Sequence, residues 1–167
     1  MKKLSLLILI SLFISQACTI SYSLTGASIA PDVKTISVQN FVNRAPLGLP
    51  NLEPLITDEL KDKFKSQTSL TLVREDGHLN FEGEITKYAT RPMAITGDET
   101  AAQNRLSITL KVKFTNEIEP QYNFDADFTR FADYNSDQDL SSVEEQLVAT
   151  IVEELIEDIF NKSVVNW

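Results

Sequence analysis

Apolar and polar residues alternate most regularly in segment 105–114, RLSITLKVKF. Its even-numbered residues are apolar and its odd-numbered residues are polar or charged. This pattern predicts a β-strand with one buried and one solvated face. Further strand signals lie at 33–41, 70–73, 79–89 and 122–134.

A helical period replaces the alternation after Asn51, which is a candidate N-cap. Pro54 falls in the first turn of this helix, where proline is tolerated. One face of the predicted helix is apolar and consists of Leu52, Leu55, Ile56, Leu60 and Phe64.

The segment 141–162 predicts a second helix. Ser141 with Glu144, or Ser142 with Glu145, would form a capping box at its start. A wide apolar stripe runs along it through Val143, Leu147, Val148, Ile151, Val152, Leu155, Ile156, Ile159 and Phe160.

The predicted order of elements is β-α-β-β-β-α. Strands with one polar face, together with amphipathic helices, favour an α+β two-layer sandwich. We expect a mainly antiparallel sheet of about four strands, with two helices on one face, in a single domain over residues 32–167.

The N-terminus has the layout of a secretory signal peptide over residues 1–17. Lys2 and Lys3 precede the apolar run 4–14, and Ala17 is followed by Cys18, the only cysteine. Eleven helical residues rise only about 16 Å, too short for a hydrocarbon core of roughly 30 Å. A buried N-terminal helix is the alternative.

Cys18 and the residues before it resemble the lipobox of bacterial lipoproteins, in the looser form of the Bacteroidota, although Ser15 stands where leucine is commoner. The resemblance implies that Cys18 is acylated, with palmitate among its chains, and holds the protein to the inner leaflet of the outer membrane. Residues 18–31 would form a tether. No acidic cluster follows the cysteine, which favours a protein that faces the periplasm.

Charge limits the partners of the mature chain. Removal of residues 1–17 takes away two lysines and leaves 13 basic and 24 acidic residues, a formal charge of −11. So acidic a protein is a poor ligand for nucleic acid or for bare anionic headgroups.

The sequence offers few candidate residues for catalysis or metal binding. His78 lies in the turn EDGH, which favours a solvated turn histidine over a catalyst or ligand. The acidic stretches VREDGH and 133–139 suggest calcium, but the second lacks the central glycine and terminal glutamate of an EF-hand loop. We therefore expect no metal, no cofactor and no enzymatic activity.

Several phrases of the chain together resemble the LptE family of lipopolysaccharide-assembly lipoproteins, in its Bacteroidota form. They are ISVQNF, a proline-broken loop, LEPLITDELKDKF, LTLV, LNFEGEITKY, RLSITLKVKFTN, FTRFADY and VEELIEDIFNKSVVNW. The resemblance covers residues 18–167. The first strand and helix also resemble TolB N-terminal and CsgG-like domains.

The LptE resemblance implies a non-enzymatic lipoprotein that plugs the LptD barrel and assists the placement of lipopolysaccharide in the outer leaflet. The polar face of the sheet would then meet the polar lumen of the barrel. The alternative is another periplasmic envelope-assembly or secretion lipoprotein with a TolB-N or CsgG-like fold.

The segment 89–104 is the first candidate for contact with the barrel or the lipid, because it is longer than a tight hairpin needs. Arg91 and Arg105 place positive charge at its base, for phosphate or carboxylate, and Pro92, Met93 and Ile95 make an apolar tip. The alternative is a solvated hairpin.

Lys111 and Lys113 on the polar face of segment 105–114 are further candidates for contact. If the following turn centres on Ile118, they lie opposite Asp125 and Asn123, which favours a cross-strand ladder over a ligand patch. The acidic face of the last helix is either solvated or a partner surface; it holds Glu144, Glu145, Glu153, Glu154, Glu157 and Asp158.

Overall fold

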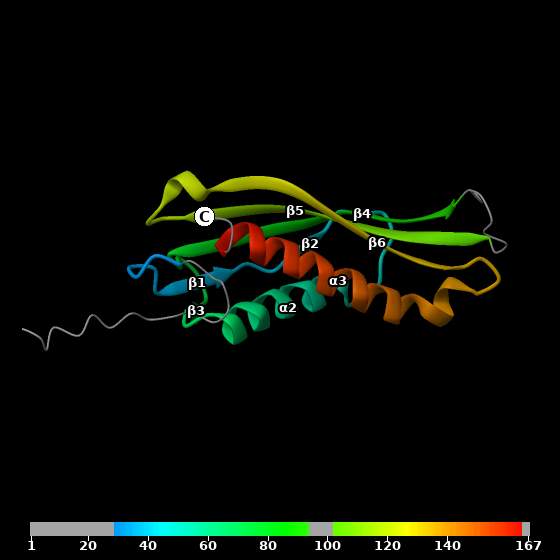
Figure 1. Ribbon diagram of the computed structural model, residues 1–167, viewed down its shortest axis with the longest axis horizontal. Coiled ribbons are helices and arrows are strands. Elements are labelled where there is room, and N and C mark those ends of the chain that lie inside the picture. Colours follow the sequence, from blue (N-terminus) through cyan, green and yellow to red (C-terminus); the bar gives the residue numbers. More distant parts are fainter. Residues whose placement is uncertain (1–28, 94–101, 165–167) are drawn as a thin grey trace, which may run out of the picture.

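The computed structural model describes residues 29–93 and 102–164 (Figure 1). Cys18 and Ile95 therefore lie outside the described residues. The helices are α2 (Leu52–Gln67) and α3 (Leu140–Val164), with a 3-10 turn at Pro120–Tyr122. The strands are β1 (Thr35–Val38), β2 (Val42–Asn43), β3 (Thr71–Val73), β4 (Leu79–Met93), β5 (Gln103–Asn116) and β6 (Phe124–Asn135).

The predicted α+β sandwich is confirmed, with six strands in the sheet rather than about four. Its strand order is β3-β1-β4-β5-β6, and β2 also pairs with β4. The long strands β4, β5 and β6 are antiparallel, whereas β1 and β2 run parallel to β4. The parallel pairing arises because α2 carries the chain across from β1 and β2 to β3 and β4.

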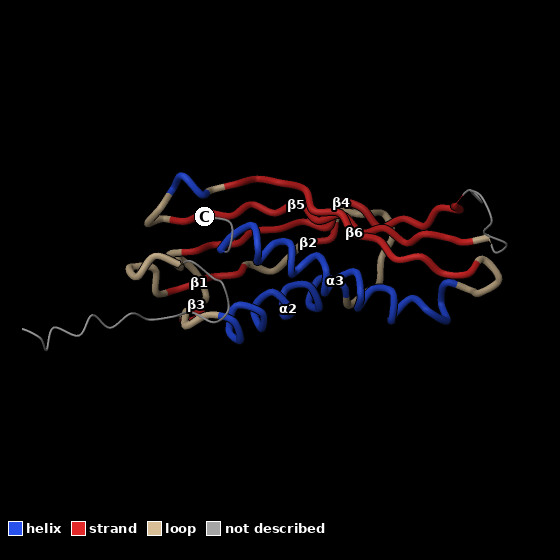
Figure 2. The backbone as a smooth tube through the Cα atoms, in the orientation of Figure 1, coloured by secondary structure: helices blue, strands red, loops and turns tan. Residues whose placement is uncertain are grey.

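Both helices lie on one side of the sheet (Figure 2). We call that side the inner face and the opposite side the outer face. The even-numbered residues of β5, from Leu106 to Phe114, are fully buried on the inner face. Phe64 of α2 joins the layers, because its ring centroid lies 5.2 Å from that of Phe81 and 5.0 Å from that of Phe160.

A β-bulge interrupts the pairing of β4 with β5. The register passes from Ile85↔Leu110 to Lys87↔Thr109, so Thr86 is an extra residue on β4. Beyond the bulge, Tyr88 is buried on the inner face, and Arg91 shares the outer face with its pairing partner Arg105.

Strand β4 continues through Pro92, so the expectation that segment 89–104 is a loop is wrong at both ends. Arg91, Pro92 and Met93 belong to β4 and Arg105 belongs to β5. A proline fits inside this strand because Pro92 lies beyond Asn43, the last residue that pairs with the other side of β4. Pro92 is paired with Asn104, whose backbone groups bond to β6, so the nitrogen of Pro92 faces away from β5. Its missing N–H therefore costs no ladder hydrogen bond.

The predicted strand 33–41 ends early, at Val38. Phe41 turns into the core, where its backbone N–H donates to Thr57 Oγ1 at 3.0 Å. Its ring packs on Gly83 of β4 so closely that an added Cβ would lie 2.1 Å from Phe41 Cε1. Gly83 thus makes room for the break between β1 and β2.

The predicted helix caps are not formed as expected. Asn51 occupies the N-cap position of α2, but its side chain makes no capping hydrogen bond. Helix α3 begins at Leu140, so Ser141 and Ser142 lie inside its first turn, and Ser142 Oγ donates to the carbonyl of Asp139 at 2.7 Å. The capping boxes are therefore wrong.

Candidate functional site

The outer face of β4, β5 and β6 is polar and carries most of the predicted contact residues. They form two groups, one around Arg105 and one around Lys111 and Lys113. Six residues of strand separate Arg105 from Lys111, about 20 Å at the usual rise per residue. The structure therefore does not bring the predicted residues together in one site.

The first group lies where β4 ends at Met93 and β5 begins at Gln103, which we call the hairpin end of the sheet. There Arg91, Arg105 and Asp133 form one row across the three strands. Arg105 Nε and an Arg105 terminal nitrogen donate to the two carboxylate oxygens of Asp133 at 2.7 and 2.8 Å. The guanidinium of Arg105 also stacks 3.5 Å from the centroid of Phe131. The Arg105 side chain therefore has a structural role, because it links β5 to β6.

These contacts change the titration of both charged partners. The hydrogen bonds from Arg105 lower the pKa of the Asp133 carboxyl, against the opposing effect of partial burial. The same hydrogen bonds raise the pKa of Arg105. The pair therefore stays ionised over a wider pH range than either group alone.

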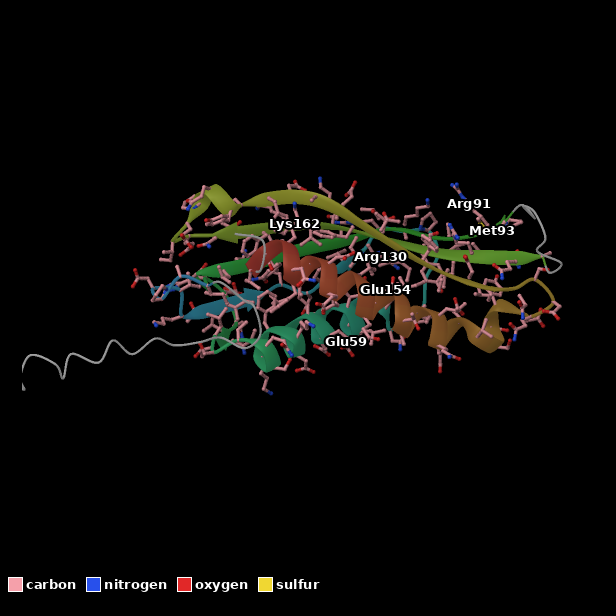
Figure 3. The ribbon with its side chains drawn as sticks, in the orientation of Figure 1. Glu59, Arg91, Met93, Arg130, Glu154 and Lys162 are labelled. Atoms are coloured by element: carbon pink, nitrogen blue, oxygen red, sulfur yellow. The ribbon has the colours of Figure 1, made fainter. Side chains whose placement is uncertain are left out.

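Arg91 differs from Arg105 although the two are paired. Its side chain is exposed, and within residues 29–93 and 102–164 no carboxylate forms an ion pair with it. Met93, on the same face, is 36% exposed. Figure 3 shows both side chains near the hairpin end, on the side of the sheet away from the helices. Arg91 and Met93 thus present a cation beside an apolar group.

Lys111 and Lys113 lie in a ladder of alternating charge, as expected, but in a different register. Lys111 pairs with Asp127 and Lys113 with Asp125, so the predicted partners Asp125 and Asn123 are wrong. The connection centres one residue later than predicted, because it contains the 3-10 turn and Asn116 Oδ1 accepts from the N–H groups of Ile118 and Glu119.

Each of these lysines has a carboxylate partner. Lys111 Nζ lies 3.5 Å from Asp125, diagonally across the ladder, and Lys113 Nζ lies 3.0 Å from Glu82 on β4. An open groove of about 360 Å³ adjoins them, where the chain breaks between β1 and β2. Its lining includes Glu82 and Glu84, which the sequence reasoning missed because it assigned no register between β4 and β5.

A hydrogen bond between Tyr88 and Glu144 joins the inner face to α3. Tyr88 is 7% exposed. Burial and the hydrogen bond that its phenol donates to Glu144 raise the pKa of Tyr88 well above its usual range. This contact fixes the start of α3 beneath the hairpin end.

His78 has a structural role in the turn between β3 and β4. Its ring Nδ1 accepts from the backbone N–H of Lys34 at 3.1 Å, and the backbone N–H of His78 donates to Thr35 Oγ1 at 3.0 Å. Gly77 beside it donates to Ser37 Oγ at 3.1 Å. The turn is thereby attached to β1 on both sides.

Two further observations concern membrane-spanning helices and metal-binding clusters in the described part of the chain. None of the helices there is sufficiently long and apolar to cross a membrane. Likewise, residues 29–93 and 102–164 contain no group of three or more His, Cys, Asp or Glu side chains placed to hold a metal ion.

Comparison with known proteins identifies the family. A family model described as LptE, lipopolysaccharide-assembly, matches residues 33–163. The chain belongs to the LptE family. The match spans every strand of the sheet and both helices except the last residue of α3, so the LptE resemblance of the sequence is confirmed. No curated protein matches the chain.

Solved structures resemble this chain at low sequence identity. A neuraminyllactose-binding hemagglutinin homologue from Helicobacter pylori is 10% identical, with a TM-score of 0.52 over 85% of this chain and 89% of that chain. A minor lipoprotein from Acinetobacter baumannii is 15% identical, with a TM-score of 0.49 over 78% of this chain and 91% of that chain.

Proposed function

We propose that this LptE-family protein is an outer-membrane lipoprotein that plugs an LptD-type barrel and assists the assembly of lipopolysaccharide into the outer leaflet. The observation that carries the proposal is the family match over residues 33–163. In this proposal Cys18 bears the lipid anchor, the domain faces the periplasm, and the protein performs no catalysis.

The chemistry of the outer face supports a role inside a polar lumen. Its residues on β5 are polar or charged: Arg105, Ser107, Thr109, Lys111 and Lys113. The lysines and Arg105 already have carboxylate partners, so β5 can lie against a polar wall without leaving its own charges unpaired.

Arg91 and Met93 are the strongest contact residues for lipopolysaccharide in this proposal. Arg91 has no carboxylate partner within residues 29–93 and 102–164, so its guanidinium can form two parallel hydrogen bonds to a phosphate, and the neighbouring thioether suits an acyl chain. Arg105 has the supporting role of holding the hairpin end through Asp133 and Phe131.

Co-purification tests the proposal. The chain is tagged after Trp167, outer membranes are solubilised with a mild detergent, and the proteins that elute with it are identified and counted. We expect a stable one-to-one complex with a large LptD-type barrel. Recovery of the protein alone, or as a ring of its own copies, overturns the plug and favours another envelope-assembly lipoprotein.

The anchor is tested separately with Cys18→Ala. Mass spectrometry of the mature wild-type protein should show an acylated N-terminal cysteine, and the variant should leave the membrane fraction. An unmodified Cys18 in the mature protein contradicts the anchor, whatever the result for the barrel.

A further inference from the structure

Strand β6 is the long open edge of the sheet. It spans twelve residues, Phe124–Asn135, and pairs only with β5 among the described strands. The edge at the other side, β3, has three residues. An unpaired strand of this length presents a row of backbone donors and acceptors that can pair with another strand.

The register shows which backbone groups of β6 face outward. Ser136 N–H donates to the carbonyl of Ala102 at 3.0 Å, and the pairing continues from Gln103↔Asn135 to Phe114↔Phe124 without a shift. In such a ladder, alternate residues direct both backbone groups to the same neighbour. Even-numbered residues of β6 therefore bond to β5, and the outward groups belong to Asp125, Asp127, Thr129, Phe131 and Asp133.

Carboxylates accompany this edge on both faces. On the outer face, Asp125 and Asp127 lie beside the outward backbone groups, and the Asp125 side chain is 55% exposed. On the inner side, an open groove of about 520 Å³ runs between Arg130 of β6 and α3. The α3 residues that line it are Thr150, Glu153, Glu154, Glu157 and Asp158.

The cations of this groove do not balance its acids. Arg130 donates two hydrogen bonds to Asp158, at 2.6 and 2.7 Å. Its Nε lies 4.0 Å from the Glu154 carboxylate, which is beyond hydrogen-bond distance. Glu157 is paired with Lys63. Glu153 has no basic partner within residues 29–93 and 102–164. Figure 3 shows Arg130 above Glu154, between the sheet and α3.

We propose that the open edge of β6 binds an extended, basic segment of a partner protein, which adds to the sheet as a further strand. The backbone of that segment pairs with the outward groups of the five odd-numbered residues from Asp125 to Asp133. Its side chains alternate between the two faces, so lysine or arginine on one face meets Asp125 and Asp127, and on the other meets Glu153 and Glu154.

Charge disfavours a second copy of this chain as the occupant. Two copies of β6 would bring the same aspartates together, on proteins that each carry a formal charge of −9 before any processing. Repulsion between these acidic residues thus opposes pairing of two β6 edges, whereas a basic strand is attracted to the same edge. This proposal does not depend on the barrel partner proposed above.

The test uses the protein with its signal peptide removed and a fluorescent, N-acetylated peptide of alternating lysine and valine. Binding is measured by fluorescence polarisation at low and high salt. Three comparison peptides are used. One has glutamate in place of lysine, and one has the same composition in scrambled order. The third is N-methylated on alternate backbone amides, which block one edge of the peptide strand.

Three variants separate the backbone from the side chains. Thr129→Pro removes an outward N–H and keeps the ladder to β5, whereas Thr129→Val removes only the hydroxyl that contacts Thr109. Thr90→Pro makes the same change on the open part of β4, beyond the bulge. We expect Thr129→Pro to weaken binding about tenfold and the other two to stay within about twofold.

Amide hydrogen exchange by NMR provides a readout that does not need a folded proline variant. The amides of Asp125, Asp127, Thr129, Phe131 and Asp133 should exchange quickly in the free protein and slow down when the lysine–valine peptide binds. Amides of the even-numbered residues should be protected in both states.

Several outcomes would overturn the proposal. Equal binding of the N-methylated or scrambled peptide would show attraction to charge alone, and no binding of the lysine–valine peptide would remove the site. Pairing of two copies through β6, seen as a dimer by light scattering that Thr129→Pro abolishes, would assign the edge to self-association instead.

Discussion

Tyr88 of β4 donates a hydrogen bond to Glu144 in the first turns of α3, and so connects the hairpin end of the sheet to the helix beneath it. We expect Tyr88→Phe to lower the free energy of unfolding by about 1–3 kcal/mol, because a carboxylate loses its phenol donor. Urea denaturation at neutral pH measures this. Tyr134→Phe, which keeps the bond, is the control and should cost less.

Alkaline pH should weaken the wild-type protein through the same residue. The pKa of Tyr88 is raised in the folded state, so its contribution is complete below the ordinary tyrosine pKa of about 10 and is lost as the pH rises toward the folded value. Melting temperatures from pH 8 upward should therefore fall further in the wild type than in Tyr88→Phe. Parallel curves would contradict this assignment.

Acidic pH should weaken the protein through Asp133. Hydrogen bonds from Arg105 lower its folded pKa, so its contribution is present above the ordinary aspartate pKa of about 3.9 and is lost as the pH falls through the folded value. Asp133→Asn should melt below the wild type at pH 6, and the difference should shrink toward pH 3. Asp137→Asn, at an exposed position after β6, is the control.

Gly83 and Phe41 should behave as one packing unit. A methyl group at Gly83 would overlap the Phe41 ring, so we expect Gly83→Ala to cost about 1–3 kcal/mol of stability. In a Phe41→Leu background the same change should cost less, because the smaller side chain leaves room. A double-mutant cycle by urea denaturation gives the coupling, and additive costs would show that the overlap relaxes elsewhere.

Arg91 and Arg105 should separate into a contact residue and a structural residue. Arg91→Glu should weaken the binding of purified lipopolysaccharide about tenfold and leave the melting temperature unchanged. Arg105→Glu should lower the melting temperature, because it places a second acid beside Asp133 and removes the stack on Phe131.

Lys65→Glu on α2 is the matched control for Arg91→Glu, since it reverses an exposed charge far from the hairpin end. An equal loss of lipopolysaccharide binding in Lys65→Glu would reduce the effect of Arg91 to net charge. Unchanged binding in Arg91→Glu would remove Arg91 from the proposed contact.

Local patterns predicted those elements whose burial depends on their own sequence. The even-numbered residues of β5 are buried as their alternation predicts, and Leu52, Ile56, Leu60 and Phe64 form the buried face of α2. Such periodicity follows directly from the geometry of a strand or a helix. It also sufficed for the α+β class.

Features that depend on pairing between distant segments were not predictable in this way. Pro92 looked like a loop residue, because the sequence does not show that this part of β4 pairs with β5 alone among the described strands. The partners of Lys111 and Lys113 depend on the conformation of the connection between β5 and β6. Likewise, nothing near Arg105 in the sequence indicates that Asp133 and Phe131 contact it, while Arg91 has no carboxylate partner among the described residues.

The extra residue at Thr86 divides β4 into two halves whose alternation is out of phase. If Thr86 instead paired with Thr109 and β4 ran on without a bulge, Arg91 and Met93 would turn toward α3 and Tyr88 toward the outer face. Pro92 would then fall where β5 requires a donor. The bulge at Thr86 therefore decides both which side chains the hairpin end offers to a partner and whether its proline can be accommodated.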